Sequence, residues 1–248
     1  MRALFYYFCG MSNDYFAFKQ FKIRQDGAAM KVGTDGVLLG AWTALDGTEK
    51  RVLDIGTGTG LIALMAAQRC PGARIDAVEI DESAARQAEE NAQTSPWPER
   101  IHIHNGSIQD FARSATERYD HILSNPPFFV DSLKAPDALR SAARHTDSLP
   151  FDDLVAAVDA LLAPQGRFSV IYPADQAAAF ETAANRNGLH CRRRTRVRGT
   201  PEAVFKRTLM EFSRERAAVH EEELTIESAR HEYTPEYIAR TKGFYLKF

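Results

Sequence analysis

Residues 52–60 read Val52-Leu53-Asp54-Ile55-Gly56-Thr57-Gly58-Thr59-Gly60. The apolar run at the start of this stretch predicts a buried strand, and the glycines directly after it predict a tight turn into a helix over 61–69. A second strand over 74–80 and a helix from about residue 81 to 93 complete a strand–helix–strand unit. Because ligands of such units bind at the carboxyl ends of the strands, we expect a site there.

The residues of this unit indicate which ligand to expect. Glycines at 56, 58 and 60 let the backbone pass close to a ligand. Glu79 ends the second strand 25 positions after Asp54, near the roughly 20 expected of an acid that binds a ribose. Asp54 would repel a phosphate, which favours an amino-bearing, cationic nucleoside such as S-adenosylmethionine over NAD. A tight turn without a ligand is the alternative.

A second motif, Asn125-Pro126-Pro127-Phe128, follows the apolar strand predicted at 119–123. Two consecutive prolines cannot donate to a sheet, so the strand must end here and a rigid turn begin. The asparagine amide can donate and accept hydrogen bonds, and the phenylalanine offers a flat face. Together they suit a planar group that carries an exocyclic or amide nitrogen. The alternative is a turn that only terminates the strand.

A third strand is predicted at 101–104, and the turn after it should lie over the adenine of a bound nucleoside. Ser107 or Asp110 could reach that adenine. His102 and His104 alternate onto one face of this strand, but no cysteine or acidic cluster stands at metal-ligand spacing. We therefore predict no metal site.

Composition sets outer limits on what the chain does. With 248 residues, 44% hydrophobic and 26% charged, it is long enough for one large soluble domain. A net charge of −2 gives no global field toward nucleic acid, so any such binding must come from a local patch. The three cysteines are scattered, which fits a reducing, cytoplasmic compartment. The apolar run at 4–9 is too short to span a membrane, and we expect neither a signal peptide nor a membrane contact.

Taken in order, the glycine turn, the acid at 79 and the Asn-Pro-Pro-Phe motif resemble a class I S-adenosylmethionine-dependent methyltransferase that methylates amino groups. Residues 30–42, Met-Lys-Val-Gly-Thr-Asp-Gly-Val-Leu-Leu-Gly-Ala-Trp, and residues 143–145, Ala-Arg-His, resemble the bacterial tRNA1(Val) adenine-37 N6-methyltransferase family. The resemblance covers about residues 15–248. It implies an α/β, Rossmann-like class I fold with a mostly parallel seven-stranded sheet, helices on both faces and an antiparallel C-terminal strand pair.

The resemblance also implies a set of site residues. The cofactor-binding residues would be Lys31, Gly33, Thr34, Asp54, Gly56, Gly58, Gly60, Glu79, Ser107 and Asn125, and the catalytic residues Asn125, Pro126, Pro127 and Phe128. At position 107 the family most often has an acid, so Asp110 is the alternative adenine contact. For residues 31–35 the alternative to a ligand contact is a simple helix start, capped by Thr34 or Asp35.

Two stretches could contact RNA. Arg192, Arg193, Arg194, Arg196 and Arg198, with Lys206 on the next predicted strand, form a dense local positive field that can hold a phosphate backbone. The alternative is a solvated edge strand. Arg144 and His145 lie in the polar segment 130–150, which we expect to order over the substrate or to remain a solvated loop. The partner implied is tRNA, with the target adenine extruded into the pocket.

We expect two parts: residues 1–30, an N-terminal extension with a strand or hairpin arm, and residues 31–248, the methyltransferase domain. Residues 1–10 should carry little functional weight, because Met11 is a second plausible start. Three alternative functions stay open: a methyltransferase acting on guanine N2 of rRNA or on a protein glutamine, an NAD oxidoreductase, and a non-catalytic binding module. The sequence predicts no oligomeric state.

Overall fold

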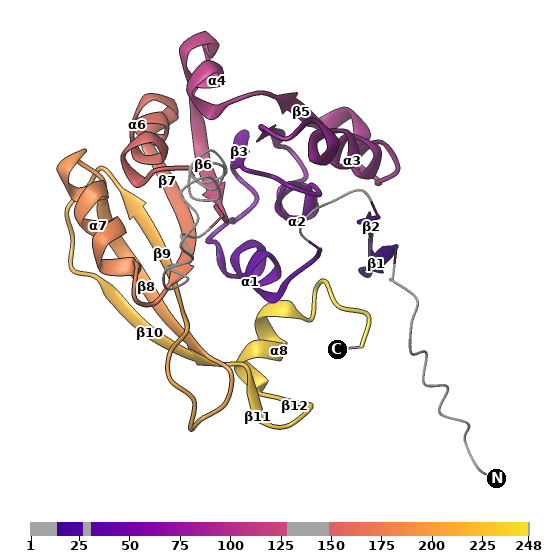
Figure 1. Cartoon of the computed structure of the whole chain (residues 1–248), viewed down its shortest axis with the longest axis vertical. Coiled ribbons are helices and arrows are strands. Elements are labelled where there is room, and N and C mark those ends of the chain that lie inside the picture. The colour runs from indigo at the N-terminus through magenta and orange to yellow at the C-terminus, as the bar shows by residue number, and fades with distance from the viewer. Residues whose placement is uncertain (1–13, 27–30, 128–148, 248) are drawn as a thin grey trace, which may run out of the picture.

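A computed structural model describes residues 14–26, 31–127 and 149–247 of the chain. Its centre is one twisted sheet with the strand order β10-β8-β9-β7-β6-β3-β4-β5 (Figure 1). The strands are β3 (Arg51–Ile55), β4 (Arg74–Glu79), β5 (Ile101–Asn105), β6 (Tyr119–Ser124), β7 (Leu162–Pro173), β8 (His190–Arg198), β9 (Arg207–Ser213) and β10 (His220–Thr225).

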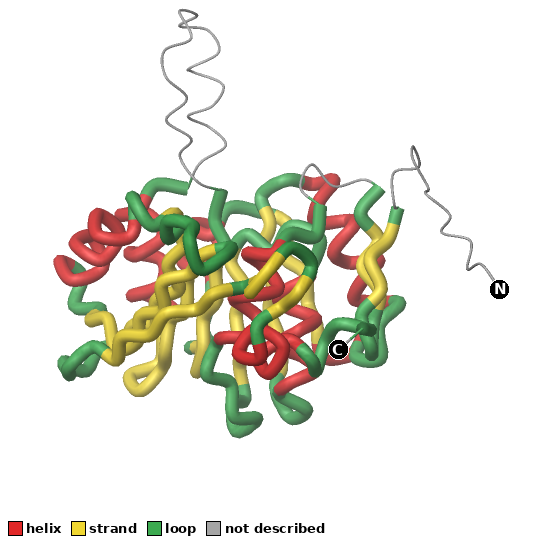
Figure 2. Tube along the Cα trace, turned by 90° about the horizontal axis from the view of Figure 1, so that it is seen from below, coloured by secondary structure: helices red, strands yellow, loops and turns green. Residues whose placement is uncertain are grey.

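Helices cover both faces of this sheet, so the molecule has three layers (Figure 2). The helices are α1 (Thr34–Trp42), α2 (Leu61–Arg69), α3 (Glu82–Gln93), the 3-10 turn η1 (Pro98–Arg100), α4 (Ile108–Ser114), α6 (Phe151–Leu161), α7 (Ala177–Arg186) and α8 (Pro235–Thr241). One buried cluster joins α1, α2, α3 and α8 to one sheet face, and a second joins α4, α6 and α7 to the other. Neighbouring strand residues such as Val52 and Leu53 divide between the two clusters, because side chains alternate across a strand.

The chain reverses direction across the sheet between β3 and β6. From β3 it builds outward through β4 to β5, and then crosses back to place β6 on the other side of β3. All four strands run parallel, so their carboxyl ends share one edge. In an open α/β sheet, ligands bind at such a switch point. This edge therefore brings the two sequence motifs together.

The predicted fold is confirmed, and the sheet of the described residues carries one strand more than the seven expected. The added strand is β10, an acidic segment that pairs parallel to the basic strand β8. The antiparallel C-terminal pair is β8 with β9, as expected. The proline at 164 and the glycine at 166 predict a turn over 163–166 between a helix and a strand. This boundary was wrong, because β7 begins at Leu162, directly after α6.

The N-terminal arm is a two-stranded hairpin of β1 (Tyr15–Ala17) and β2 (Lys22–Arg24). Its turn residues Phe18 and Phe21 are buried, and Phe18 stacks on Tyr245 near the C-terminus. A second small hairpin, β11 (Glu227–Ala229) with β12 (Glu232–Tyr233), lies between β10 and α8. The predictions for residues 1–10, for Phe128, and for Arg144 and His145 fall outside the described residues. No helix in the described ranges is long and apolar enough to cross a membrane.

Candidate active site

The glycine turn between β3 and α2 is held open by backbone hydrogen bonds. The N–H groups of Gly56 and Thr57 both donate to the carbonyl oxygen of Val78 on the neighbouring strand. Gly58 has a φ of +56°, in the left-handed region that favours glycine. A Cβ added at Gly56 or at Gly58 would meet no atom within 4 Å. There is therefore open space beside the backbone of the turn at these two glycines. Gly60 is the residue just before α2.

Asp54, at the end of β3, is completely buried. Its Oδ2 accepts hydrogen bonds from the Thr57 hydroxyl at 2.6 Å and from the Ala63 N–H at 3.2 Å. Its Oδ1 has no hydrogen-bond partner in the structure. Burial, and to a smaller extent nearby Glu79, raises the pKa of this carboxyl to about 7, although the hydrogen bonds from Thr57 and Ala63 lower it. Asp54 thus supports the turn from beneath. Its position in the sequence had instead suggested a charge that faces the ligand.

Glu79, the last residue of β4, is held in place by two backbone groups. Its Oε2 accepts from the Gly58 N–H at 2.8 Å, and its Oε1 accepts from the Asp81 N–H at 3.0 Å. Each carboxylate oxygen keeps a further lone pair, so the side chain can still accept two hydrogen bonds from a ribose diol. The glycine turn and the acid predicted to bind the ribose are therefore in direct contact.

Two neighbours of Glu79 were missed by the sequence analysis. Ile80 is 70% exposed, and a large apolar side chain so exposed beside a ligand edge can pack on a flat base. The Asn105 side-chain amide donates to the carbonyl of Glu79 at 3.0 Å and to that of Ile80 at 3.4 Å. The position of Ile80 directly after the acid could be read from the sequence, but its exposure could not, and the role of Asn105 depends on strand register.

The turn after β5 is occupied by a helix cap. The Ser107 hydroxyl oxygen accepts from the Asp110 N–H and the hydroxyl itself donates to Asp110 Oδ2 at 2.6 Å. Asp110 also forms an ion pair with Arg113. Ser107 and Asp110, the two candidates for the adenine contact, are thus bonded to each other. They lie at the carboxyl end of β5, the place where that contact was predicted.

The Asn-Pro-Pro motif leaves the sheet beside the glycine turn. Ser124, the last residue of β6, is buried and its hydroxyl donates to the carbonyl of Ile55 at 2.9 Å. This bond fixes the end of β6 to the end of β3, directly before the first glycine. Asn125 is half-buried, Pro126 is buried and Pro127 is exposed. The structure therefore places an amide side chain at the switch point, next to the predicted cofactor turn.

Helix α1 adjoins the same place. A Cβ added at Gly36 would lie 3.9 Å from Asn125 Nδ2 and 3.0 Å from a methyl carbon of Leu61. Gly33 precedes the helix, and Thr34 is its exposed first residue. The prediction that Thr34 or Asp35 caps α1 was wrong, because no side chain caps this end. Asp35 instead forms an ion pair with Arg207 at 2.7 Å.

Lys31 is exposed, and the segment that carries it is fixed by its neighbour: the Val32 N–H donates to the side chain of buried Gln25 at 2.9 Å.

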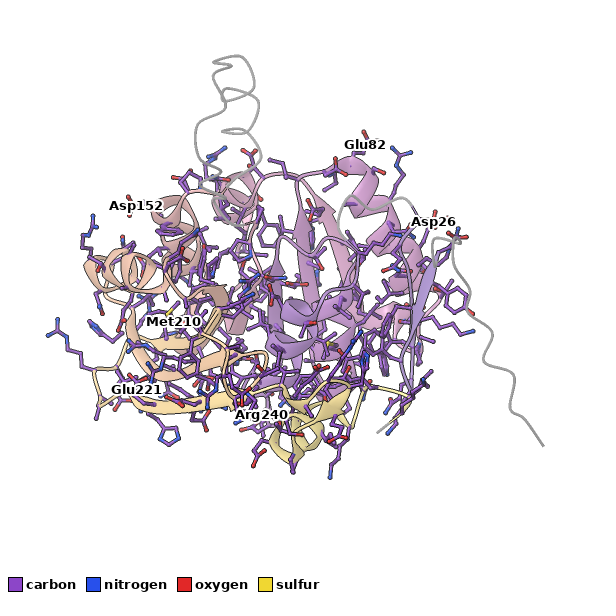
Figure 3. All side chains as sticks on the ribbon, turned by 60° about the horizontal axis from the view of Figure 1, so that its bottom comes forward. Asp26, Glu82, Asp152, Met210, Glu221 and Arg240 are labelled. Carbon is purple, nitrogen blue, oxygen red and sulfur yellow. The ribbon has the colours of Figure 1, made fainter. Side chains whose placement is uncertain are left out.

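Figure 3 shows Glu82, at the start of α3, and Asp152, at the start of α6, on the same side of the molecule. The first turns of both helices lie at the edge where the strands deliver their motifs. No group of three or more potential metal ligands occurs in the described part of the chain.

The arginine run on β8 is largely neutralised by acids of the chain itself. The ion pairs are Arg192 with Glu215, Arg193 with Glu222, Arg194 with Glu181 and Glu221, and Arg196 with Glu223. Three of these acids belong to the added strand β10, on which Glu221 is labelled in Figure 3. The run therefore lacks the uncompensated positive field on which the RNA prediction depended. Arg198 and Lys206 have no acidic partner among the residues described.

A parallel sheet with this switch point, an open glycine turn bonded to a strand-ending acid, and an amide after the next strand define a class I methyltransferase. Comparison with known proteins agrees. The family described as "Methyltransferase small domain" matches residues 32–176. Among solved structures, a "predicted O-methyltransferase" from Agrobacterium tumefaciens superposes with a TM-score of 0.65 at 21% identity, over 85% of this chain and 96% of that one.

Curated relatives match nearly the whole chain. A protein from Phocaeicola vulgatus is 51% identical over 95% of this chain and 99% of its own length, and one from Trichodesmium erythraeum is 49% identical over 96% and 100%. One from Flavobacterium psychrophilum is 48% identical over 94% and 99%. Each is named a tRNA1(Val) (adenine(37)-N6)-methyltransferase. The chain belongs to this family of methyltransferases.

Proposed function

We infer that this chain transfers a methyl group from S-adenosylmethionine to the exocyclic N6 of adenine 37 in tRNA1(Val). The observation that carries the inference is the 48% to 51% identity, over at least 94% of the chain, to relatives that bear this activity in their names. The position of Asn125 beside the glycine turn supports the choice of an amino group as the methyl acceptor.

S-adenosylmethionine, when bound, supplies a methyl group on a positively charged sulfur. The residues at the edge of the sheet fit such a nucleoside. Glu79 would accept hydrogen bonds from the ribose hydroxyls, because the Gly58 and Asp81 N–H groups already orient its carboxylate. Ile80 would pack against the adenine, and Ser107 or Asp110 would lie beside it. We assign Lys31, Gly33 and Thr34 to the same ligand from their place at the start of α1.

The acceptor nitrogen poses the chemical problem. The lone pair of an adenine amino group is delocalised into the ring, so the site must orient that pair toward the methyl donor. Asn125 Oδ1 and the carbonyl of Pro126 can each accept one N–H of the amine. They would hold the nitrogen in place and stabilise the positive charge that develops on it. Phe128 would stack on the base, which is worth about 1–3 kcal/mol on comparable platforms.

No dedicated general base is required before the methyl group moves, because the acceptor reacts as a neutral amine. The proton leaves the nitrogen after transfer. Until then, the two carbonyl oxygens are the groups that stabilise the charged nitrogen. This division of labour makes positioning the main contribution of the chain to the rate. It also explains why the motif has an amide and a backbone carbonyl, neither of which titrates near neutral pH.

The experiment is a substrate comparison. The purified chain is incubated with S-adenosylmethionine labelled in its methyl group and, separately, with total tRNA, ribosomal RNA or a protein extract. We expect label in tRNA only. Label confined to ribosomal RNA would support a guanine-N2 methyltransferase, and label confined to protein would support a glutamine methyltransferase. Either result would overturn the proposed substrate.

Two further assignments are part of the proposal. We retain residues 31–248 as the methyltransferase domain and residues 1–30 as an extension with an arm. The hairpin of that arm also packs into the core shared with α1 and α2. An enzyme that modifies tRNA works where tRNA is, so we propose a cytoplasmic location.

A further inference from the structure

The charges of β8 and the β8–β9 turn fall into two groups. Four arginines from 192 to 196 pair with acids, as described above. Within the described ranges, Arg198 donates only to the Thr225 hydroxyl, at 3.0 Å. Lys206 is exposed, and no hydrogen bond or ion pair joins its side chain to another described residue. The uncompensated positive charge of this region is therefore confined to the C-terminal end of β8 and the start of β9.

These two cations lie at the edge of the sheet that carries the active site. β7 is parallel to β6 and antiparallel to β9, and β8 is antiparallel to β9, so β8 ends at the same edge as β6. The Ala174 N–H, just after β7, donates to the carbonyl of Lys206. Three strand spacings separate β6 from β8, about 14 Å.

A chain of contacts connects this turn to Asn125. Arg207, the residue after Lys206, forms the ion pair with Asp35 on α1. The next residue of that helix is Gly36, which faces the Asn125 amide. Two contacts through space, Arg207 with Asp35 and Gly36 with Asn125, thus connect the turn to the residue proposed to hold the target amine.

The turn also carries apolar and aromatic surface. Val204 is 74% exposed. The Phe205 ring lies beneath two guanidinium groups, 4.6 Å from that of Arg196 and 5.1 Å from that of Arg198. On its other side the turn adjoins the β10–β11 segment, where the Glu227 N–H donates to the carbonyl of Gly199, and Figure 1 shows β11 and β12 beside it. Surfaces that combine positive charges with aromatic and apolar side chains bind single-stranded nucleic acid.

We propose that residues 198–206 are the docking surface for the RNA strand next to the methylated nucleotide. Arg198 and Lys206 bind phosphate oxygens, and Val204 with Phe205 contacts a neighbouring base. Of the remaining arginines of β8, Arg193, Arg194 and Arg196 pair with acids of β10. Arg192 pairs with Glu215, and none of these four arginines touches RNA. The proposal deepens the proposed function and rests on it for the identity of the RNA. It narrows the RNA contact from the whole arginine run to one turn.

The test is the salt dependence of tRNA binding by the full chain. Lys206→Ala is compared with Lys50→Ala, because Lys50 is also an exposed lysine and lies before β3, at the opposite ends of the strands. Losing one phosphate contact lowers the slope of log affinity against log salt by about 0.7–0.9. We expect that loss, with binding weakened about fivefold at low salt, for Lys206→Ala and no change for Lys50→Ala. Val204→Asp should weaken binding about tenfold.

A variant that adds positive charge serves as a control for misfolding, because a misfolded protein would not bind tRNA more tightly. Glu202 is an exposed acid within the turn, so Glu202→Lys should tighten tRNA binding and steepen the salt slope. The docking surface would be overturned if Lys206→Ala and Lys50→Ala had equal slopes of log affinity against log salt and Glu202→Lys bound tRNA as wild type does. It would also be overturned if the wild-type chain did not bind tRNA. If wild type binds tRNA with the predicted variant effects but transfers no methyl group to it, the proposed function fails and the surface stands.

Discussion

Asp54 and Glu79 illustrate how two acids of one site acquire different properties. Both were predicted from the spacing of the glycine turn. The sequence could not show that Asp54 is buried beneath the turn, since that depends on how α2 packs over β3. Nor did spacing identify Ile80, whose significance is its exposure. Residue types along the chain therefore indicated a candidate site, and burial in the structure distinguished Asp54 from Glu79 within it.

The buried carboxyl of Asp54 gives a pH prediction. Its pKa is raised to about 7 in the folded chain, above the roughly 3.9 of an exposed aspartate. Between these values the folded state binds more protons than the unfolded state, so stability falls as pH rises. The asparagine of Asp54→Asn cannot ionise, so this variant does not lose stability in this way as pH rises. Relative to wild type, its unfolding free energy should increase by about 2 kcal/mol between pH 5 and pH 8.

Denaturant unfolding of both proteins at several pH values measures this difference. Other groups with shifted pKa values, such as Glu211, are common to both proteins and cancel in the comparison. A difference that stays constant over this pH range would show that Asp54 is ionised in the folded state.

Gly58 gives a second prediction, on ligand affinity. Gly58→Ala forces a side chain into left-handed backbone at a cost of about 1–2 kcal/mol and places a methyl group above the turn. We expect S-adenosylmethionine to bind at least about tenfold more weakly. Gly72→Ala is the matched control, because Gly72 also has open space around it but no positive φ. Calorimetric titration compares the two, and equal affinities would contradict a ligand over the glycine turn.

Strands β8 and β10 show where prediction of elements ended. The sequence predicted β8, its antiparallel partner and the arginine run. The acidic segment from Glu221 onward fits a strand or a helix equally well from its sequence. Its parallel pairing with β8 joins residues 27 positions apart, such as Thr195 with Glu222, and no local pattern encodes that register. Likewise, the boundary between α6 and β7 was wrong because a proline and glycine at 164 and 166 were taken for a turn, whereas tertiary pairing with β6 extends the strand.

Glu222 holds these elements together, which gives a stability prediction. It accepts from the Thr195 hydroxyl at 2.7 Å and the Arg193 guanidinium at 3.1 Å, and it pairs with Arg240 of α8. Glu222→Ala leaves the buried Thr195 hydroxyl without an acceptor and removes the carboxylate that pairs with Arg193 and Arg240, and we expect a loss of about 2 kcal/mol. Glu221→Ala removes a more exposed acid and should cost less than about 1 kcal/mol. Thermal unfolding compares the two, and equal losses would contradict a central role for Glu222.

Across the whole molecule, the chain is slightly acidic, with a net charge of −2. Recognition of RNA must therefore come from the arrangement of a few charges. That arrangement follows from the fold. The switch point places the glycine turn next to Asn125, and this proximity was predicted from the order of the motifs along the chain. Because β9 is antiparallel to both β7 and β8, the end of β8 lies at the same edge; this placement, and the acids that neutralise most of the arginine run, became known only from the sheet topology.

The central claim is that Asn125 holds an adenine amino group of tRNA for methyl transfer. The most direct measurement is mass spectrometry of nucleosides from tRNA incubated with methyl-labelled S-adenosylmethionine and either wild type or Asn125→Ala, with cofactor affinity measured on the same preparations. We predict labelled N6-methyladenosine with wild type and a rate at least about 100-fold lower with the variant, at similar cofactor affinity. Label in another nucleoside, or a variant as fast as wild type, would contradict the claim.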